Sequence, residues 1–415
     1  MKKAKINSAT RTALFFILIM GIVSLLSDMT HEGAKSIYGD FLRLNGASYF
    51  SISLISGLGE FLGSSLIFVT GYIASRTKKY WLMTFIGYAI NMLAIPALAL
   101  VMPGGYLWAG ALIIAERIGK AIRKPAKNTM VSFVSHKMGV GKSFAMLEVL
   151  DQIGAFLGPV MLTGVLLLSK NEDTLTNYRL SFLFLLIPAI LCLIFLFIAR
   201  IKYPKPEDYE TAEEVKSEEQ LAGKNKQVFI IYIVASLLSA IAFLDFPLIS
   251  AYISDQGYLS AEYLPLAYAF AMLIDAIGAF VFGLLFDRFG IRLLPYVSLL
   301  GVLLTPLIFL THSLGSVAAG VAIWGLIMGA NESVLKAAVA TIVPKARRAW
   351  GYGLFEGLYG IAWFAGSVLI GLLIEKSIIW MVIFCVVVSL LATVFYFLSS
   401  YIDSGKKLTK EKNSH

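Results

Sequence analysis

Ionisable side chains stand inside apolar stretches of this sequence, at spacings that place them on helix faces. Between residues 12 and 42 four such side chains fall within an arc of about 100° of one helix: Asp28, His31, Glu32 and Lys35. A carboxyl group buried there is kept protonated by desolvation and can exchange a proton near neutral pH. We expect Asp28 and Glu32 to carry protons, with His31 and Lys35 in the same cavity. The alternatives are that Glu32 and Lys35 neutralise each other, or that the group lies at the outer membrane surface.

A second set of charges forms one stripe between residues 106 and 133: Glu116, Lys120, Arg123 and Lys127. Arg117 and Lys124 widen the stripe into a basic face, which would attract an anionic solute. We expect Arg117 and Lys120 to line a cavity and Glu116 to take part in proton transfer. Arg123, Lys124 and Lys127 are expected at the cytoplasmic end, in contact with lipid headgroups.

Single acids in other apolar stretches are further candidates, because a charge within a membrane segment is costly and usually functional. The additional proton-coupling candidates are Asp245, Asp275 and Glu332. The additional cavity candidates are Glu60, Asn331, Lys336, Tyr359 and Trp363. Local pairing is the alternative for each acid, for example between Glu332 and Lys336, and core packing or an interfacial belt is the alternative for the aromatic residues.

A third group of acids is expected near the loops on the cytoplasmic side. Glu148 and Asp151 share one helix face, and Glu356 stands in a similar segment of the second half. We expect these residues to belong to a gate, where they pair with arginines such as Arg76 or Arg288. A direct role in proton coupling is the alternative.

The elements that position these residues must be membrane helices. Of 415 residues, 58% are hydrophobic and 15% are charged, against about 25% charged in an average soluble domain. This composition excludes a disordered chain, a nucleic-acid-binding domain and an ordinary cytosolic enzyme. A spanning helix needs roughly 20 apolar residues, so the chain predicts an all-α membrane protein with twelve spans. The spans are expected at 12–42, 46–74, 80–103, 106–133, 143–168, 179–200, 228–253, 263–286, 293–312, 316–343, 350–374 and 378–402.

The polar, Pro-containing segment 201–227 cannot cross a bilayer and divides the chain into six spans plus six. We therefore expect helix bundles at 1–200 and 228–415, joined by a cytoplasmic linker. Most Lys and Arg lie in segments on the side of the N-terminus, and the opposite side carries few: Arg43, Lys170, Arg179 and Lys376. The positive-inside rule then predicts that both termini are cytoplasmic. We expect the protein to lie in the plasma membrane.

The two halves also repeat each other. Residues 144–159 align without a gap with residues 352–367, so that Glu148 matches Glu356 and Gly158 matches Gly366. The third, sixth, ninth and twelfth spans have almost no charge in their apolar cores, whereas the other eight each contain at least one. We expect the four uncharged spans to face lipid and the other eight to share a protein-lined or hydrated interior.

This layout resembles the major facilitator superfamily over nearly the whole chain. The family's loop motif, Gly-x-x-x-Asp-Arg-x-Gly-Arg, is matched at Gly283, Asp287, Arg288, Gly290 and Arg292. Its first copy is matched at Gly71, Arg76, Lys78 and Lys79, but Ser75 stands where the family usually has Asp. The resemblance implies that both loops gate the cytoplasmic side.

A second motif of the family, Gly-x-x-x-Gly-Pro, resembles Gly154, Gly158 and Pro159. The resemblance implies export by antiport, and tight helix packing by small residues is the alternative. No motif for covalent catalysis or for a metal occurs in the sequence.

The sequence therefore predicts a secondary transporter that moves a small organic solute by alternating access, by proton-coupled export. The alternatives are uptake or facilitated diffusion of an anion, and a non-transporting receptor or scaffold on the same fold. We expect no cofactor beyond the proton gradient and no enzymatic activity. The expected partners are a small-molecule substrate, protons and the bilayer, with no nucleic acid, and the protein is expected to be a monomer.

Overall fold

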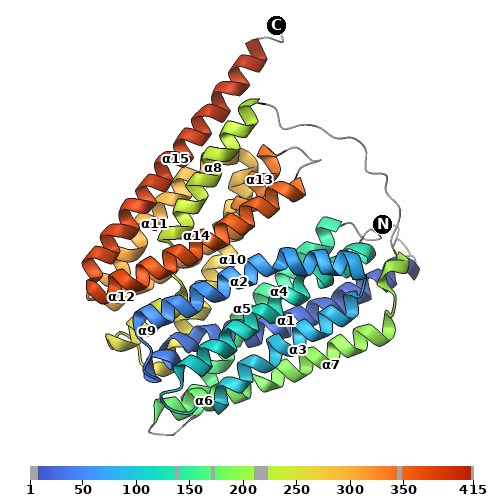
Figure 1. Cartoon of the computed structure of the whole chain (residues 1–415), viewed down its shortest axis with the longest axis vertical. Helices are drawn as coiled ribbons and strands as arrows, with labels where there is room; N and C mark the ends of the chain where they lie inside the picture. Colours follow the sequence, from blue (N-terminus) through green and yellow to red (C-terminus); the bar gives the residue numbers. More distant parts are fainter. Residues whose placement is uncertain (1–7, 136–139, 170–172, 210–222, 344–347, 413–415) are drawn as a thin grey trace, which may run out of the picture. The chain divides into compact units, whose positions relative to one another are not determined.

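The computed structural model of the chain describes residues 8–135, 140–169, 173–209, 223–343 and 348–412, and these residues form helices without any strand (Figure 1). The helices of the first half are α1 (Ser8–Leu44), α2 (Tyr49–Thr77), α3 (Tyr80–Ala97), α4 (Tyr106–Ser135), α5 (Val140–Leu168), α6 (Thr174–Phe184) and α7 (Leu186–Lys202). Those of the second half are α8 (Gly223–Ala242), α9 (Phe246–Asp255), α10 (Leu264–Phe289), α11 (Leu294–Phe309), α12 (Leu314–Ala330), α13 (Lys336–Ile342), α14 (Arg348–Lys376) and α15 (Ile378–Lys412).

Each predicted span coincides with one helix or with two consecutive helices. Ten helical stretches in the described part are long and apolar enough to cross a membrane, one of which covers both α10 and α11. Helix α4 is not among them, because its charged stripe lowers its hydropathy.

Three predicted spans are interrupted, and the sequence pattern did not predict these interruptions. Helices α6 and α7 meet at Leu185. Pro188, three residues later, has no N–H to donate to the carbonyl four residues before it, so the helical hydrogen-bond pattern is interrupted here. Helices α8 and α9 are separated at residues 243–245, and Trp324 Nε1 donates to the freed carbonyl of Leu244 at 2.8 Å. A π-helical turn, Asn331–Leu335, joins α12 to α13. Such turns occur frequently at functional sites.

The described residues form two compact units. Unit 1 takes residues 8–46, 62–209 and 260–269, and unit 2 takes residues 47–61, 223–259 and 270–412. Helices α2 and α10 are therefore each divided between the units. The predicted division into bundles at 1–200 and 228–415 stays a prediction.

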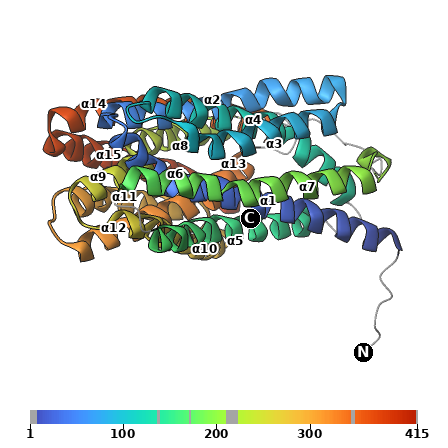
Figure 2. The ribbon, with the colours of Figure 1, turned by 90° about the horizontal axis from the view of Figure 1, so that it is seen from below.

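Unit 1 is built around α1, which packs most extensively on α5 and also runs beside α7 (Figure 2). The contact with α5 is close because Gly154 and Gly158 lie against the backbone of Leu25 and Met29, where a Cβ atom would overlap a carbonyl oxygen. In unit 2, α8 packs most extensively on α15 and also on α14, where Gly366 lies against the backbone of Ile241. The repeat seen in the sequence is thus also a repeat of helix contacts.

Helices α7 and α15 each expose an apolar stripe, as expected for lipid-facing spans. The stripe of α7 consists of Ile187, Ile190, Ile194, Phe197 and Ile201, and that of α15 of Ile383, Val387, Leu390, Val394 and Phe397. Helix α3 also exposes apolar residues, but its opposite face buries the polar Asn91. That polar face contributes to the candidate functional site.

Candidate functional site

The centre of the charged cluster in unit 1 is His31 of α1. Its Nδ1 atom lies 2.9 Å from Oε1 of Glu116 on α4, and its Nε2 atom lies 3.6 Å from Oε1 of Glu32. His31 is 2% exposed and Glu116 is 1% exposed. An imidazole placed between two carboxylates can donate to one of them and exchange a proton with the other.

Helix α3 fixes the position of Glu116. The side-chain amide of Asn91 donates to the backbone carbonyl of Glu116 at 3.1 Å and also to its carboxylate. The two helices can approach this closely because Gly119 lies against the backbone of Asn91, leaving no room for a side chain. The other carboxylate oxygen of Glu116 faces Nε of Arg117 at 3.6 Å. The carboxylate of Glu116 is therefore in contact with His31, Asn91 and Arg117.

Glu32 has two neighbours of its own. Nζ of Lys35 lies 3.8 Å from its Oε2 atom, so the i, i+3 pairing weighed from the sequence is present. Tyr268, in the first turns of α10 that belong to unit 1, donates its hydroxyl to the same oxygen at 2.5 Å. Lys35 also lies 5.8 Å from the centre of the Tyr268 ring. Glu32 is thus held by one cation and one neutral donor.

Arg123 and Lys127 are buried, at 4% and 7% exposure. Nη2 of Arg123 donates to Ser27 at 2.8 Å, and its guanidinium lies 4.2 Å from the centre of the Tyr88 ring. Lys127 donates to Ser24 at 2.5 Å. The expectation that these two cations contact lipid headgroups is therefore wrong.

Arg123 and Lys127 are buried because of the direction in which their side of α4 faces. The α4 stripe faces α1, whose serines three residues apart supply acceptors for both cations. Lys124, one position off the stripe, is exposed as expected.

Asp28 completes the cluster from α1. It interacts electrostatically with Asp151 of α5 and with Lys120 and Arg123 of α4. The gate role expected for Asp151 stays a prediction, and its interaction with Asp28 fits the alternative, a role in proton coupling. Repulsion between the two carboxylates is relieved when one of them binds a proton.

The buried cluster of unit 1 has more cations than acids. Its acids are Asp28, Glu32, Glu116 and Asp151, and its bases apart from His31 are Lys35, Arg117, Lys120, Arg123 and Lys127. The cations of this set outnumber its acids by one when all four acids are ionised, and by two when one acid is protonated.

The remaining cavity and coupling candidates belong to unit 2. Asp245, in the break between α8 and α9, accepts from Nε1 of Trp363 and from the hydroxyl of Ser367, both at 3.0 Å. Tyr359 packs on Trp363 with ring centres 5.9 Å apart. Asp275 is buried where Gly329 of α12 lies against its backbone.

The other candidate residues lie on the π turn, on α13 and on α2. Asn331 begins the π turn, Glu332 is exposed on it, and Glu60 is partly exposed on α2. The side chain of Lys336 is outside the described residues, so its predicted pair with Glu332 stays a prediction.

The predicted gate residues of the two loop motifs lie in the last turns of α2 and α10 and just after them. In the first copy of the loop motif, Arg76 donates from Nε to Tyr72 at 3.2 Å near Gly71. In the second copy, Gly290 has φ +60°, a conformation that favours glycine and so explains this position of the motif. Gly283, Asp287 and Arg288 precede it on α10, and the Arg288 guanidinium lies 5.4 Å from the Phe289 ring centre.

The predicted gate pairs are not formed within either unit. In the described residues, neither Glu148 in unit 1 nor Glu356 in unit 2 forms an ion pair with a residue of its own unit. Pro159 follows Gly158 inside α5, at the contact with α1.

Sequence reasoning missed three polar residues of this unit. Asp40 is 2% exposed and accepts from Tyr178 of α6 at 2.6 Å. Asn91 and Tyr88 lie in a span that was expected only to face lipid. A single Asn within an otherwise apolar helix is the signal that could have identified α3 as a partner of the charged helices.

Comparison with known proteins identifies the family. The model of the Major Facilitator Superfamily matches residues 12–330. An uncharacterized protein of Mycobacterium bovis is 34% identical over 395 residues, covering 94% of each chain. An uncharacterized MFS-type transporter of Methanocaldococcus jannaschii is 29% identical over 147 residues, covering 35% of this chain and 36% of its own length.

Solved transporters share the fold. A bacterial homolog to the human lysosomal transporter Spinster, in an inward-facing and unoccupied conformation, has a TM-score of 0.72 at 16% identity and covers 94% of this chain and 97% of its own. The nucleoside transporter NupG has a TM-score of 0.71 at 15% identity and covers 93% and 98%. At such identities the likeness concerns the fold alone.

The chain belongs to the Major Facilitator Superfamily. It is a multi-pass membrane protein and a secondary transporter of a small molecule rather than an enzyme.

Proposed function

We propose that this transporter exports a small organic solute in exchange for protons, with the charged cluster of unit 1 as the proton-coupling site. The observation that carries the proposal is the contact of His31 with Glu116 and Glu32, beside the Asp28 and Asp151 carboxylates. Groups that can exchange a proton are thus gathered on three helices of one unit. We further propose that the protein acts as a monomer in the plasma membrane, with both termini cytoplasmic and no cofactor.

Coupling follows from the charge balance of the cluster. Protonation of Asp28 or Glu32 removes the attraction of that carboxylate for Lys120 or Lys35. Breaking a desolvated charge pair changes the free energy by a few kcal/mol. A change of about that size is enough to shift the populations of two conformations. Proton binding on one side of the membrane and release on the other would then drive alternating access.

The direction of transport rests on the Gly-x-x-x-Gly-Pro motif, which in this family accompanies export. The structure gives Gly154 and Gly158 a packing role against α1. Because α1 carries Asp28 and Glu32, a close α1–α5 contact would link movement of α5 to the coupling site. This link supports the proposal without fixing the direction.

The test begins with a thermal-shift screen of the purified protein against metabolites and drugs at several pH values. A ligand found in this way is then loaded into proteoliposomes, and its flux is measured under an imposed pH gradient. The proposal predicts movement of the ligand against the direction of proton flow and loss of the gradient-driven part when a protonophore is added. A flux that is the same with and without the pH gradient would contradict proton coupling.

A second candidate function is uptake or facilitated diffusion of an anion, and the excess of cations in the cluster favours it. Among the described residues, Lys120 is partly exposed and has no acid within 4.0 Å. Its ammonium group is therefore available to a carboxylate or phosphate of a solute. This candidate predicts saturable anion flux without proton movement that falls strongly in Arg117→Gln and Lys120→Gln. Unchanged flux in both variants would exclude it.

A further inference from the structure

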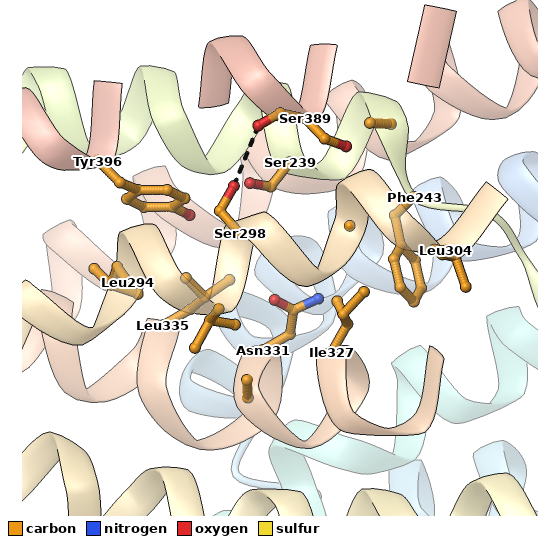
Figure 3. A pocket seen from close by; sticks show the side chains of 14 residues that line it. Ser239, Phe243, Leu294, Ser298, Leu304, Ile327, Asn331, Leu335, Ser389 and Tyr396 are labelled. Atoms are coloured by element: carbon orange, nitrogen blue, oxygen red, sulfur yellow. Dashed lines mark hydrogen bonds between the residues drawn. The ribbon is translucent and has the colours of Figure 1, made fainter. Parts of the chain in front are cut away.

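Unit 2 contains a small, partly open cavity of about 30 Å³ between α8, α11, α12, α15 and the π turn (Figure 3). Its polar lining consists of Ser239, Ser298, Asn331, Ser389 and Tyr396. Figure 3 shows the Asn331 amide pointing from its helix toward the side on which Ser298 and Ser239 lie. Since about 10–15 Å³ of such volume accommodates one water, the cavity has room for about two.

The internal repeat identifies the counterpart of this cavity in unit 1. Gly158 and Gly366 are 208 residues apart, and they lie against Met29 and Ile241, which are 212 residues apart. With these offsets, Ser239 of α8 corresponds to Ser27 of α1. Asn331, which follows directly on α12, corresponds to Arg123 of α4.

The register of α4 and of α12 with its π turn agrees with this correspondence. Gly119, Arg123 and Lys127 of α4 are all buried. The residues 208 positions later, Ile327, Asn331 and Leu335, all line the cavity. The cavity therefore lies where unit 1 holds the guanidinium of Arg123 between Ser27 and Tyr88.

The charges that accompany Arg123 in unit 1 have no counterpart in unit 2. The residue that corresponds to Asp28 is Ala240, and the residue that corresponds to Asp151 is Tyr359. A cation in the cavity would therefore lack the nearby acids that Arg123 has, which makes its burial costly. The chemistry of the lining suits a small neutral ligand that both donates and accepts hydrogen bonds.

Polar groups around the cavity can still accept such a ligand. Oγ of Ser239 is buried and has no hydrogen-bond partner of normal geometry, since the nearby Tyr396 hydroxyl donates to Ser236 at 3.0 Å. Ser298, which lines the cavity, donates to the Ser389 carbonyl at 3.4 Å and accepts from the Thr393 hydroxyl at 3.0 Å, which leaves one of its two lone pairs for a ligand. A buried water needs two to four polar partners, and these residues supply them.

We propose that two water molecules occupy this cavity, hydrogen-bonded to Asn331, Ser239 and Ser298, in the place that Arg123 fills in unit 1. The waters supply hydrogen bonds where α12 leaves the regular α-helical pattern at the π turn. The inference does not depend on the substrate or on proton coupling.

The test is radiolytic hydroxyl-radical footprinting of the full-length protein, purified in nanodiscs, after rapid mixing into 18O-labelled water. Bound water is activated in place, so Leu304 and Tyr396 should be oxidised, with oxygen that exchanges more slowly than bulk water. We expect oxidation of both residues to fall about threefold or more in Asn331→Leu and in Ser239→Ala. Ser333→Ala is the matched control, because its hydroxyl donates to Gly329 at 2.7 Å on the same turn outside the cavity.

Thermal unfolding of Asn331→Leu, Ser239→Ala and the double variant provides a second measurement. Because the two residues share the same waters, the fall in Tm of the double variant should be smaller than the sum of the single falls. Absence of oxidation at Leu304 and Tyr396 in the wild type would overturn the proposal. Oxidation that is unchanged in both single variants, or additive falls in Tm, would also overturn it.

Discussion

Nδ1 of His31 lies 2.9 Å from Oε1 of Glu116, which joins α1 and α4 at the centre of the charged cluster in unit 1. Both side chains are almost fully buried, and Asn91 holds Glu116 from α3. A buried pair of this kind is sensitive to the loss of either partner, because the other is left without compensation.

Glu116→Ala should destabilise the protein strongly. It removes the carboxylate beside His31 and leaves the Asn91 amide with only the backbone carbonyl of residue 116 as acceptor, at a cost of about 1–3 kcal/mol for a lost buried partner. Glu116→Gln should cost less, since its amide oxygen still accepts one hydrogen bond. Thermal unfolding in detergent measures both, with Glu148→Gln on exposed α5 surface as the control. Equal stability of the alanine variant and the wild type would contradict the contact.

Arg123→Lys should lower the free energy of unfolding although the charge is kept. The lysine loses the stacking of the guanidinium on Tyr88 and the donation to Ser27, together worth about 1–2 kcal/mol. Lys124→Gln is the neighbouring control and should change stability by no more than about 0.5 kcal/mol, because Lys124 is exposed. If both changes have the same small effect, Arg123 is not buried as described.

Gly158→Ala should lower the free energy of unfolding and Gly164→Ala should raise it, although both residues lie in α5. The new methyl group at 158 would overlap the Met29 carbonyl, and such overpacking costs about 1–3 kcal/mol. At 164 nothing lies within 4 Å of the added atom, and alanine is favoured over glycine in a helix by roughly 0.5–1 kcal/mol. Denaturant or thermal unfolding distinguishes them, and equal tolerance of both changes would refute the close α1–α5 contact.

Asp245→Ala should destabilise unit 2, because the indole N–H of Trp363 and the hydroxyl of Ser367 lose their acceptor. We expect a loss of about 1–3 kcal/mol, only part of which occurs in Asp245→Asn. Asp287→Asn, at an exposed position of α10, serves as the control. An alanine variant as stable as this control would show that Asp245 is not a partner of the two donors.

The helices themselves could be predicted from the sequence because spanning segments need long apolar runs. Every predicted span contains helix, and the family was identified from Gly283, Asp287, Arg288 and the six-plus-six layout. The breaks at Leu185 and at 243–245 and the π turn could not be predicted in this way. They depend on single hydrogen bonds, such as that from Trp324 to Leu244, which apolar periodicity does not record.

The candidate site could be predicted only in part, for a similar reason. Spacing along α1 placed His31 beside Glu32, but it could not show that Glu116 comes from another helix to meet it. Arg123 and Lys127 were wrongly predicted to contact lipid headgroups, because their position near a helix end suggested the membrane surface. Whether a cation reaches lipid or a serine depends on the neighbouring helix, which one-dimensional spacing does not specify.

Gradient-driven flux in proteoliposomes tests the central claim, that the buried acids of α1 carry the coupled protons. The wild type is compared with the double variant Asp28→Asn plus Glu32→Gln, each reconstituted in equal amount and checked for folding by thermal shift with the same ligand. We predict that a pH gradient accelerates flux in the wild type only, while ligand exchange without a gradient persists in both. Gradient-driven flux of the double variant equal to that of the wild type would contradict the claim.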